Sequence, residues 1–458
     1  MAHHLAKDQH GSSAAPGPRT APHPRTTVRV RRTTARVRRT LVLGLTVLAL
    51  GAPPWASQAA DAHLAPRAVP GAGVIDDWSR TAVDVVQTDA KRPGAEQFLW
   101  YGFVDAAVYN AVVGIEGRYA EYKWDVRGPR HASSEAAAAA AAHRILLTYF
   151  PASQARVDAA YTASLAKIPD GKAEDDGVAF GEKAAAHIVR LREGDGRGAP
   201  VTFDKPPAPG VWRPTLPANA PMVDPWLAKV RPMVLDSSDQ LRPGPPPALT
   251  STTYTKDFAE VKAMGARTGS GRTDAQTETG RFFGDVLPVQ FQAAYRGYVE
   301  RHGLDIVDAA RLFAATGTAT ADASITAWNA KLTYGQWRPI TAVRLADTDG
   351  NPATSPDPDW LPLLDTPAYP DYMSGHCTND GATMKVLSRL TGGDIDFRIS
   401  SAVTGTTRTY TSAADYNRDV INARVWAGIH FRTSDVVANR VGTRIGAWTL
   451  DHFFRPLK

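Results

Sequence analysis

The stretch from Leu304 to Leu332 reads LDIVDAARLFAATGTATADASITAWNAKL and is the longest run of helical periodicity in the chain. Its apolar residues recur at helical spacing, and its many alanines have the best helix propensity and permit close helix packing. Trp328 and Leu332 lie four residues apart and therefore share one face. We expect a long helix here, in a protein whose fold class is all-α.

Other stretches repeat the helical pattern on both sides of this run. The sequence predicts helices over Val74–Lys91, Phe98–Val113, Glu135–Phe150, Lys172–Glu193, Thr273–Val286, Val289–Arg301 and Thr378–Leu390. Pro151 ends the third of them, and Ser153 is placed to start another. Strand signals are sparse, without alternation of useful length, and no repeat occurs at solenoid spacing.

The composition divides the chain into four parts. A leader covers residues 1–60, a helical bundle 74–198, a proline-rich connector 199–250, and a second helical bundle 251–458. The prolines exclude a continuous helix in the connector. Its large apolar side chains, such as Trp212, Met222 and Trp226, are not typical of a flexible linker, so we expect an ordered segment packed on the helical body. We favour a connector without a role in the site over one that covers its mouth.

The positive charge of the chain is concentrated in the leader. Residues 1–60 hold nine Lys and Arg against one Asp, whereas the remainder holds 43 basic and 45 acidic residues. A nucleic-acid-binding face needs clustered basic charge in the folded domain, so the distribution argues against a nucleic-acid partner. The single cysteine, Cys377, excludes an intrachain disulfide and cysteine-based zinc or iron–sulfur sites.

The leader is typical of an export signal. Arg29–Arg39 is densely basic, Leu41–Ala52 is apolar, and small residues follow at 57–62. The apolar run is about half of the ~20 residues that span a bilayer, so a cleaved signal is favoured over an uncut membrane anchor. We therefore expect a secreted protein without a stable membrane span after cleavage. The paired arginines at 31–32 and 38–39 are compatible with twin-arginine export.

Three short segments in the last third of the chain carry the candidate chemistry. They read KLTYGQWRP from Lys331 to Pro339, SGH from Ser374 to His376, and RVWAGIH from Arg424 to His430. Together they supply three permanent cations, two histidines and a Ser-Gly turn. Guanidinium groups and backbone N–H groups match tetrahedral oxygens, so the set suits a compact oxyanion of phosphate size.

Each segment also has an ordinary structural explanation. Ser374 is placed to cap a helix, whose free N–H groups at Gly375 and beyond form an anion site, but capped helices are common. Lys331 and Arg338 flank a helix end predicted at Gly335, where cations are favoured by the helix dipole.

The third segment is mostly apolar, so its histidine could simply belong to the core. Arg424 and His430 are six residues apart, and a bend at Gly428 would bring their side chains closer together. Metal binding by His376 with Asp380 and by His430 with Asp435 is an alternative, but three neighbouring cations would repel a metal ion.

The ordered triple K-x6-R-P, S-G-H and R-x5-H resembles the signature of the vanadium haloperoxidase and type 2 acid phosphatase superfamily. The sequence around these motifs is similar to that of bacterial vanadium-dependent haloperoxidases from about Val74 onward. The similar segments are Ala327–Lys331, Trp337–Arg344, Tyr369–Tyr372, Val425–Arg432, Pro209–Trp212 and Arg281–Phe283. The resemblance implies two four-helix bundles with the active site in the C-terminal one.

The resemblance also implies a role for each site residue. Vanadate would be the cofactor, with His430 as the axial vanadium ligand, and phosphate could occupy the same site. Lys331, Arg338 and Arg424 would neutralise the vanadate oxygens, and Ser374 and Gly375 would complete the cradle. His376 would be the acid–base residue, Lys331 would polarise peroxide, and Trp328 and Tyr369 would lie near the halide.

The implied reaction is the oxidation of a halide by hydrogen peroxide to a hypohalous species, which halogenates a small organic substrate. A secreted acid phosphatase that works through a phosphohistidine is the alternative. Met373 departs from the family, which usually has proline at this position. We expect the absence of the proline to loosen the turn into the helix. A thiol beside an oxidant generator is unusual, so we expect Cys377 to be buried. The sequence leaves the halide and the oligomeric state open.

Overall fold

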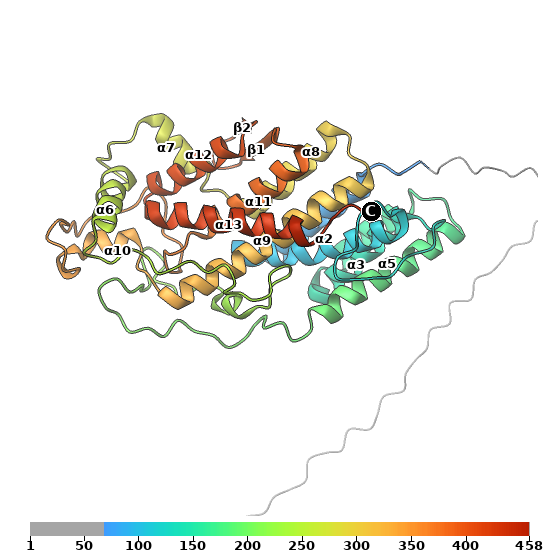
Figure 1. Cartoon of the computed structure of the whole chain (residues 1–458), viewed down its shortest axis with the longest axis horizontal. Helices are drawn as coiled ribbons and strands as arrows, with labels where there is room; N and C mark the ends of the chain where they lie inside the picture. Colours follow the sequence, from blue (N-terminus) through green and yellow to red (C-terminus); the bar gives the residue numbers. More distant parts are fainter. Residues whose placement is uncertain (1–67, 458) are drawn as a thin grey trace, which may run out of the picture. The chain divides into compact units, whose positions relative to one another are not determined.

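A computed structural model of the chain describes residues 68–457, and most of these residues are helical (Figure 1). The predicted export signal lies outside the described residues. In the N-terminal part the helices are α1 Gly73–Val83, the π-helical η1 Asp84–Asp89, α2 Gly94–Glu116, α3 Ser134–Tyr149, the short η2 Pro151–Ser153, α4 Gln154–Leu165 and α5 Lys172–Leu191. All four helices predicted in this part are confirmed.

The remaining elements follow the connector, in which only η3, Pro225–Lys229, is helical. They are α6 Thr252–Gly265, α7 Asp274–Phe282, α8 Leu287–His302, α9 Ile306–Tyr334, α10 Pro339–Arg344, η4 Ala346–Thr348, α11 Gly375–Thr391, β1 Phe397–Ser401, β2 Thr406–Tyr410, α12 Ala413–Trp426 and α13 Arg432–His452. The described residues, 68–457, lie in one compact unit.

Helix α9 confirms the prediction of a long helix over Leu304–Leu332. The side chain of Asp305 caps its start by accepting the N–H groups of Val307 and Asp308, and most of its residues are buried. Helix α9 contacts α2 on one side and α11 and α13 on another (Figure 1). Helix α2 is long and apolar enough to span a membrane, but in this structure its apolar stretch is buried in the core.

The small hairpin β1–β2 corrects the expectation of a purely helical protein. Its strands pair antiparallel, with Phe397 opposite Tyr410. Phe397 and Ile399 are buried between exposed residues, which is the alternation expected of a strand. Each strand has only five residues, too few for the alternation to stand out in the sequence.

The connector is ordered and packed, as its large apolar residues predicted. Trp212, Met222 and Met233 are buried in the main core. The carboxylate of Asp322 on α9 accepts the backbone N–H groups of Met233, Val234 and Leu235 at 2.5, 2.8 and 2.8 Å. This clamp ties the connector to the helix that carries Lys331.

Candidate functional site

The end of α9 and the start of α10 position the first pair of cations. Gly335 ends α9 in the left-handed conformation, with φ of 64°, and Lys331 lies one turn before it. Arg338 is the N-cap residue of α10. Both side chains are fully buried. The helix end predicted between Lys331 and Arg338 is therefore confirmed.

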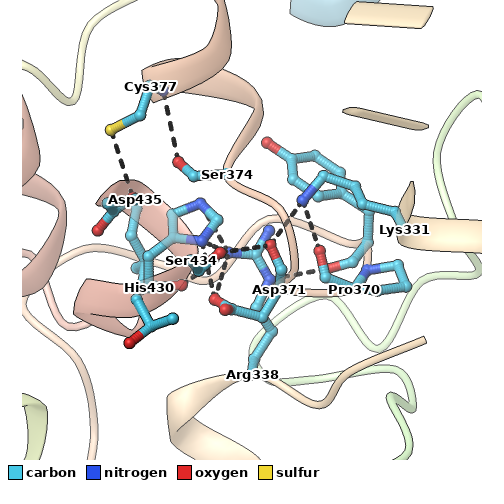
Figure 2. Close-up of polar contacts among 12 residues, drawn as sticks. Lys331, Arg338, Pro370, Asp371, Ser374, Cys377, His430, Ser434 and Asp435 are labelled. Carbon is cyan, nitrogen blue, oxygen red and sulfur yellow. Dashed lines mark hydrogen bonds and ion pairs between the residues drawn. The ribbon is translucent and has the colours of Figure 1, made fainter. Parts of the chain in front are cut away.

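Lys331 reaches the segment that precedes α11 (Figure 2). Its Nζ donates hydrogen bonds to the backbone oxygens of Pro370 at 2.7 Å and Asp371 at 2.8 Å. The same Nζ lies 4.9 Å from the ring centre of Tyr369, a cation–π contact. Burial, reinforced by the charge of Arg338, lowers the pKa of Lys331 well below its ordinary value. An anion beside Lys331 would restore its charged form.

Arg338 joins three segments of the chain. Its Nε donates to the backbone oxygen of Tyr369 at 2.7 Å, and its Nη1 donates to that of Ile429 at 2.6 Å. Nη1 also lies 3.1 Å from Nε2 of His430. Its Nη2 is buried and has no partner among the described residues. The Nε and Nη1 groups of this guanidinium therefore hold the site together, while Nη2 is left without a partner.

His430 lies between α12 and α13, after a bend at Gly428, whose φ is 77°. The expected bend and burial are confirmed, since the side chain is only 1% exposed. Nδ1 lies 2.8 Å from the carboxylate oxygen Oδ1 of Asp371. Asp371 accepts and Arg338 donates, so Nδ1 carries the proton and the lone pair lies on Nε2. Burial, followed by the charge of Arg338, lowers the pKa of His430 well below its ordinary value, which keeps the ring neutral.

The predicted cap at the start of α11 is confirmed. Ser374 is the N-cap residue, and its Oγ accepts the N–H of Cys377 at 3.5 Å. A Cβ at Gly375 would lie 3.0 Å from the ring of Trp328, so glycine lets the aromatic ring approach the helix start. Burial and then Arg424 lower the pKa of His376 well below its ordinary value. The Nε2 of His376 has no partner among the described residues.

Arg424 lies in the last turn of α12 and is buried. Its Nη1 donates to the backbone oxygen of Phe283, whereas its Nε has no partner within residues 68–457. Its charge acts on both His376 and His430, whose pKa values it helps to lower. The structure thus brings all three predicted cations and both histidines into one site.

A cavity of about 340 Å³ opens beside the start of α11. Trp328, Tyr369, Gly375 and His376 form part of its wall, and the rings of Trp328 and Tyr369 lie 4.9 Å apart. Val223 of the connector also lines it and accepts a hydrogen bond from Trp328 at 3.0 Å. The connector therefore reaches the site, although the sequence favoured a connector away from it.

Three buried carboxyl groups lie near these residues: Asp371, which the sequence analysis did not assign, and Asp380 and Asp435, which it named only in the metal alternative. Asp371 holds His430, and burial raises its pKa to about 7. Asp435 accepts from Sγ of Cys377 at 3.4 Å, and Asp380 accepts from the hydroxyl of Tyr416 at 2.8 Å. Asp380 and Asp435 therefore do not pair with histidines as the metal alternative required. Among residues 68–457 no group of three or more His, Cys, Asp or Glu side chains could hold a metal ion.

Met373, which departs from the family pattern, and Cys377 are both buried in the core. The peptide bond between Tyr372 and Met373 is cis. Cys377 is a free cysteine and is fully buried, as expected. Burial raises the pKa of its thiol well above the ordinary value, so it stays protonated. Because the thiolate is the reactive form, a protonated and buried thiol is protected from oxidants.

The fold and the buried residues described above define a mostly helical protein in which three basic side chains and two histidines lie close together. Residues 311–458 match the family model of the VCPO second helical-bundle domain. The vanadium chloroperoxidase of Curvularia inaequalis is 38% identical over 98 residues, which cover 19% of this chain and 15% of that protein. The chain thus matches less than a fifth of that relative's length.

Solved structures share the fold over most of the chain. A bacterial vanadium-dependent iodoperoxidase superimposes with a TM-score of 0.71 at 23% identity, covering 84% of this chain and 97% of that one. The holo form of a bacterial vanadium-dependent chloroperoxidase gives a TM-score of 0.65 at 19% identity, covering 84% and 98% of the two chains.

Proposed function

We propose that this protein is a vanadium-dependent haloperoxidase, which oxidises a halide with hydrogen peroxide to a hypohalous species. One observation carries the proposal: Nη2 of Arg338, Nε of Arg424 and Nε2 of His376 are buried without partners among the described residues. Buried polar groups are otherwise almost always hydrogen-bonded. Unsatisfied nitrogens beside His430 favour a ligand that is rich in acceptor oxygens, and vanadate meets this requirement.

The residues of the site have the charges and hydrogen-bond donors that binding of vanadate would require. Lys331, Arg338 and Arg424 would neutralise its oxygens, while Ser374 and the backbone N–H of Gly375 would complete the cradle. His430 would bond the vanadium through the lone pair on Nε2. Asp371 supports this role, because its carboxylate accepts a hydrogen bond from Nδ1 and fixes the ring. Bound vanadium(V) would supply Lewis-acid chemistry that activates peroxide.

His376 would handle the proton of the peroxide. It lines the cavity, and its lowered pKa keeps it neutral, so Nε2 can accept a proton there. An anion in the cradle would favour the protonated ring and let it hold that proton. Lys331 would polarise the peroxide, and Trp328 and Tyr369 would give the halide an apolar, partly dehydrated place to bind.

The fold supports two helical bundles joined by α9. Helices α2, α3 and α5 contact one another, as do α11, α12 and α13, while α9 contacts both α2 and α11. We assign the oxyanion site to the second group, within residues 251–458. The basic and then apolar leader supports export of the protein, and its oligomeric state stays open.

Halide oxidation and phosphate-ester hydrolysis can be compared directly. The full chain, incubated with orthovanadate, should oxidise iodide or bromide when hydrogen peroxide is added, and should do so in proportion to the bound vanadate. Without vanadate it should hydrolyse p-nitrophenyl phosphate far more slowly than an acid phosphatase. Hydrolysis that vanadate abolishes, with no oxidation of any halide, would establish the phosphatase alternative instead.

Two histidine variants locate the activity. His430→Ala should lose the vanadate-dependent oxidation, because it removes the side chain that would bond the vanadium. His452→Ala is a matched control, since His452 is exposed at the end of α13. Full activity in His430→Ala, or equal losses in both variants, would move the site elsewhere.

A further inference from the structure

A hollow beside α10 is separate from the residues of the oxyanion site. It has a volume of about 190 Å³ and lies between the connector turn 213–219 and residues 340–345. Two arginines line it: Arg213 comes from the connector, and Arg344 lies in the last turn of α10. None of the residues assigned to the oxyanion cradle contributes to its wall, so the hollow is a distinct candidate for a binding site.

The charge of these two arginines is not balanced by the wall, because no carboxylate side chain lines the hollow. Among residues 68–457, the side chain of Arg344 has no hydrogen bond or ion pair, and that of Arg213 donates only from Nη2, to the backbone oxygen of Ala208 at 3.2 Å. By contrast, Arg432 pairs with Glu260 at 2.7 Å. Two guanidinium groups without an acid between them favour an anionic ligand.

Both arginines can be reached from solvent. Arg213 and Arg344 are partly exposed, whereas the three cations of the oxyanion site are buried. A ligand can therefore enter the hollow without a rearrangement of the core. The space is also adequate for a small organic molecule, because a water molecule occupies only about 30 Å³ in the liquid.

The rest of the wall is largely apolar. Its apolar members are Pro214, Leu216, Ile340 and Leu345. An inorganic oxyanion would lose hydration against these side chains without gaining contacts. A carboxylate with a short apolar body matches both parts of the wall, because a guanidinium group can bond both carboxylate oxygens and the apolar body covers the remaining surface.

The ligand would join two segments that already meet beside the hollow. The backbone N–H of Trp212 donates to the oxygen of Gly335 at 2.7 Å, and that of Trp337 donates to the oxygen of Gly210 at 2.9 Å. A ligand held by an arginine from each segment would add a further link between the connector and α10. Because it binds the folded chain, it should also raise the temperature of unfolding.

We propose that this hollow binds a small organic carboxylate through Arg213 and Arg344. The proposal does not depend on halide oxidation, because neither arginine belongs to the oxyanion cradle. Binding consists of ion pairing and burial of the apolar body, and no covalent bond forms or breaks.

The probe is 4-fluorobenzoate, which combines a carboxylate with a flat apolar ring. Its binding to the full chain without vanadate is measured by fluorine NMR titration at neutral pH. The uncharged 4-fluorobenzyl alcohol tests whether the charge is recognised. The titration is repeated with orthovanadate, because an inorganic oxyanion should not displace a probe whose apolar ring is required for binding.

Four variants test the location. Arg213→Gln and Arg344→Gln should each weaken binding at least about tenfold, because each removes a charge-assisted hydrogen bond. Arg440→Gln is the matched control, since Arg440 is exposed on α13 and does not line the hollow. Leu216 lines the hollow and is 43% exposed, so Leu216→Trp should fill the space and abolish binding without removing a charge.

The control for the added ring is Val403→Trp, because Val403 is 56% exposed in the turn of the hairpin. It should bind the probe as the wild type does. Circular dichroism verifies that each protein is folded. Saturable binding that the two arginine variants and Leu216→Trp weaken, and that the controls leave unchanged, supports the site.

Other results would overturn it. They are the absence of saturable binding to the wild type, equal binding of the uncharged alcohol, displacement by orthovanadate, or an affinity in either Arg213→Gln or Arg344→Gln equal to that of Arg440→Gln. A chain that binds the probe as expected but oxidises no halide would contradict the proposed function alone.

Discussion

Two helix pairs of this protein pack in the same way but bury different side chains. Helix α3 packs on α5, and α11 packs on α13. In each pair a glycine lets the backbones meet: a Cβ at Gly181 would overlap the backbone oxygen of Ala137, and one at Gly442 would overlap that of Thr378. The close approach is therefore a shared device of the two parts of the fold.

The difference lies in what the close contact surrounds. The buried residues of α3 and α5 are small or apolar and include no ionisable side chain. Helices α11 and α13 instead bury Cys377, Asp380 and Asp435 near the site. Burial of ionisable groups is costly unless their partners are held in place. Packing in the second pair therefore fixes the site as well as the fold.

Substitution at the two glycines should separate these roles and has the largest expected effect. Gly181→Ala and Gly442→Ala should each lower the free energy of unfolding by about 3 kcal/mol, because the added methyl forces the helices apart. Only Gly442→Ala should also lose the stabilisation that vanadate gives, because it shifts the start of α11. Thermal unfolding with and without vanadate measures both effects.

Gly73→Ala is the control, since a Cβ at Gly73 would meet no atom within 4 Å. The free energy of unfolding of Gly73→Ala should differ from that of the wild type by no more than about 0.5 kcal/mol. Equal vanadate stabilisation of Gly181→Ala and Gly442→Ala would show that the packing of α11 on α13 does not position the cradle.

The next comparison sets two buried carboxyl groups against each other. Asp371→Asn should weaken vanadate binding by about 10-fold or more, because the neutral amide supports the Nδ1 proton of His430 less strongly. Asp105→Asn is the matched control: Asp105 of α2 is buried against Gly317 of α9, and one of its oxygens is also unpartnered among the described residues. Equilibrium dialysis against vanadate measures both affinities, and equal values would remove Asp371 from the positioning of His430.

The sequence predicted the parts of this protein that depend on local signals. Helix α9 lies within two residues of the expected Leu304–Leu332, because its periodicity is long and its ends carry Asp305 and Gly335. The cap at Ser374 and the bend at Gly428 were predicted for the same reason, since each is set by a residue and its immediate neighbours.

Contacts between segments that are distant in the sequence could not be predicted. Asp371 lies 59 residues before His430, and only the folded chain brings them together. In the sequence, nothing near Asp371 in the segment Tyr369–Tyr372 indicates that it pairs with His430. The available signal was its position just before the SGH segment. The cavity beside His376 was hidden for the same reason, because its wall comes from α2, α8, α9, α11 and the connector.

The smallest effect concerns the pH dependence of stability in the α11–α13 pair. Burial raises the pKa of Asp380 from its ordinary 3.8 to about 7, although the hydroxyl of Tyr416 opposes the shift. Between these values the folded protein holds a proton that the unfolded chain has released. The resulting stability is complete below the ordinary pKa and is lost as the pH rises towards about 7. The free energy of unfolding should decline by about 1 kcal/mol per pH unit within that window.

Asp380→Asn should remove this part of the slope, because the amide imitates the protonated acid and its oxygen still accepts from Tyr416. Asp451→Asn is the control, since Asp451 is exposed on α13 and pairs with Arg389 at the surface. Denaturant unfolding at several pH values gives the slope for each protein. A slope in Asp380→Asn as steep as in the control would mean that Asp380 is already ionised in the folded protein. Its charge would then be balanced within the site. The contrast with the α3–α5 pair, which buries no ionisable side chain, would rest on paired ions instead of a neutral acid.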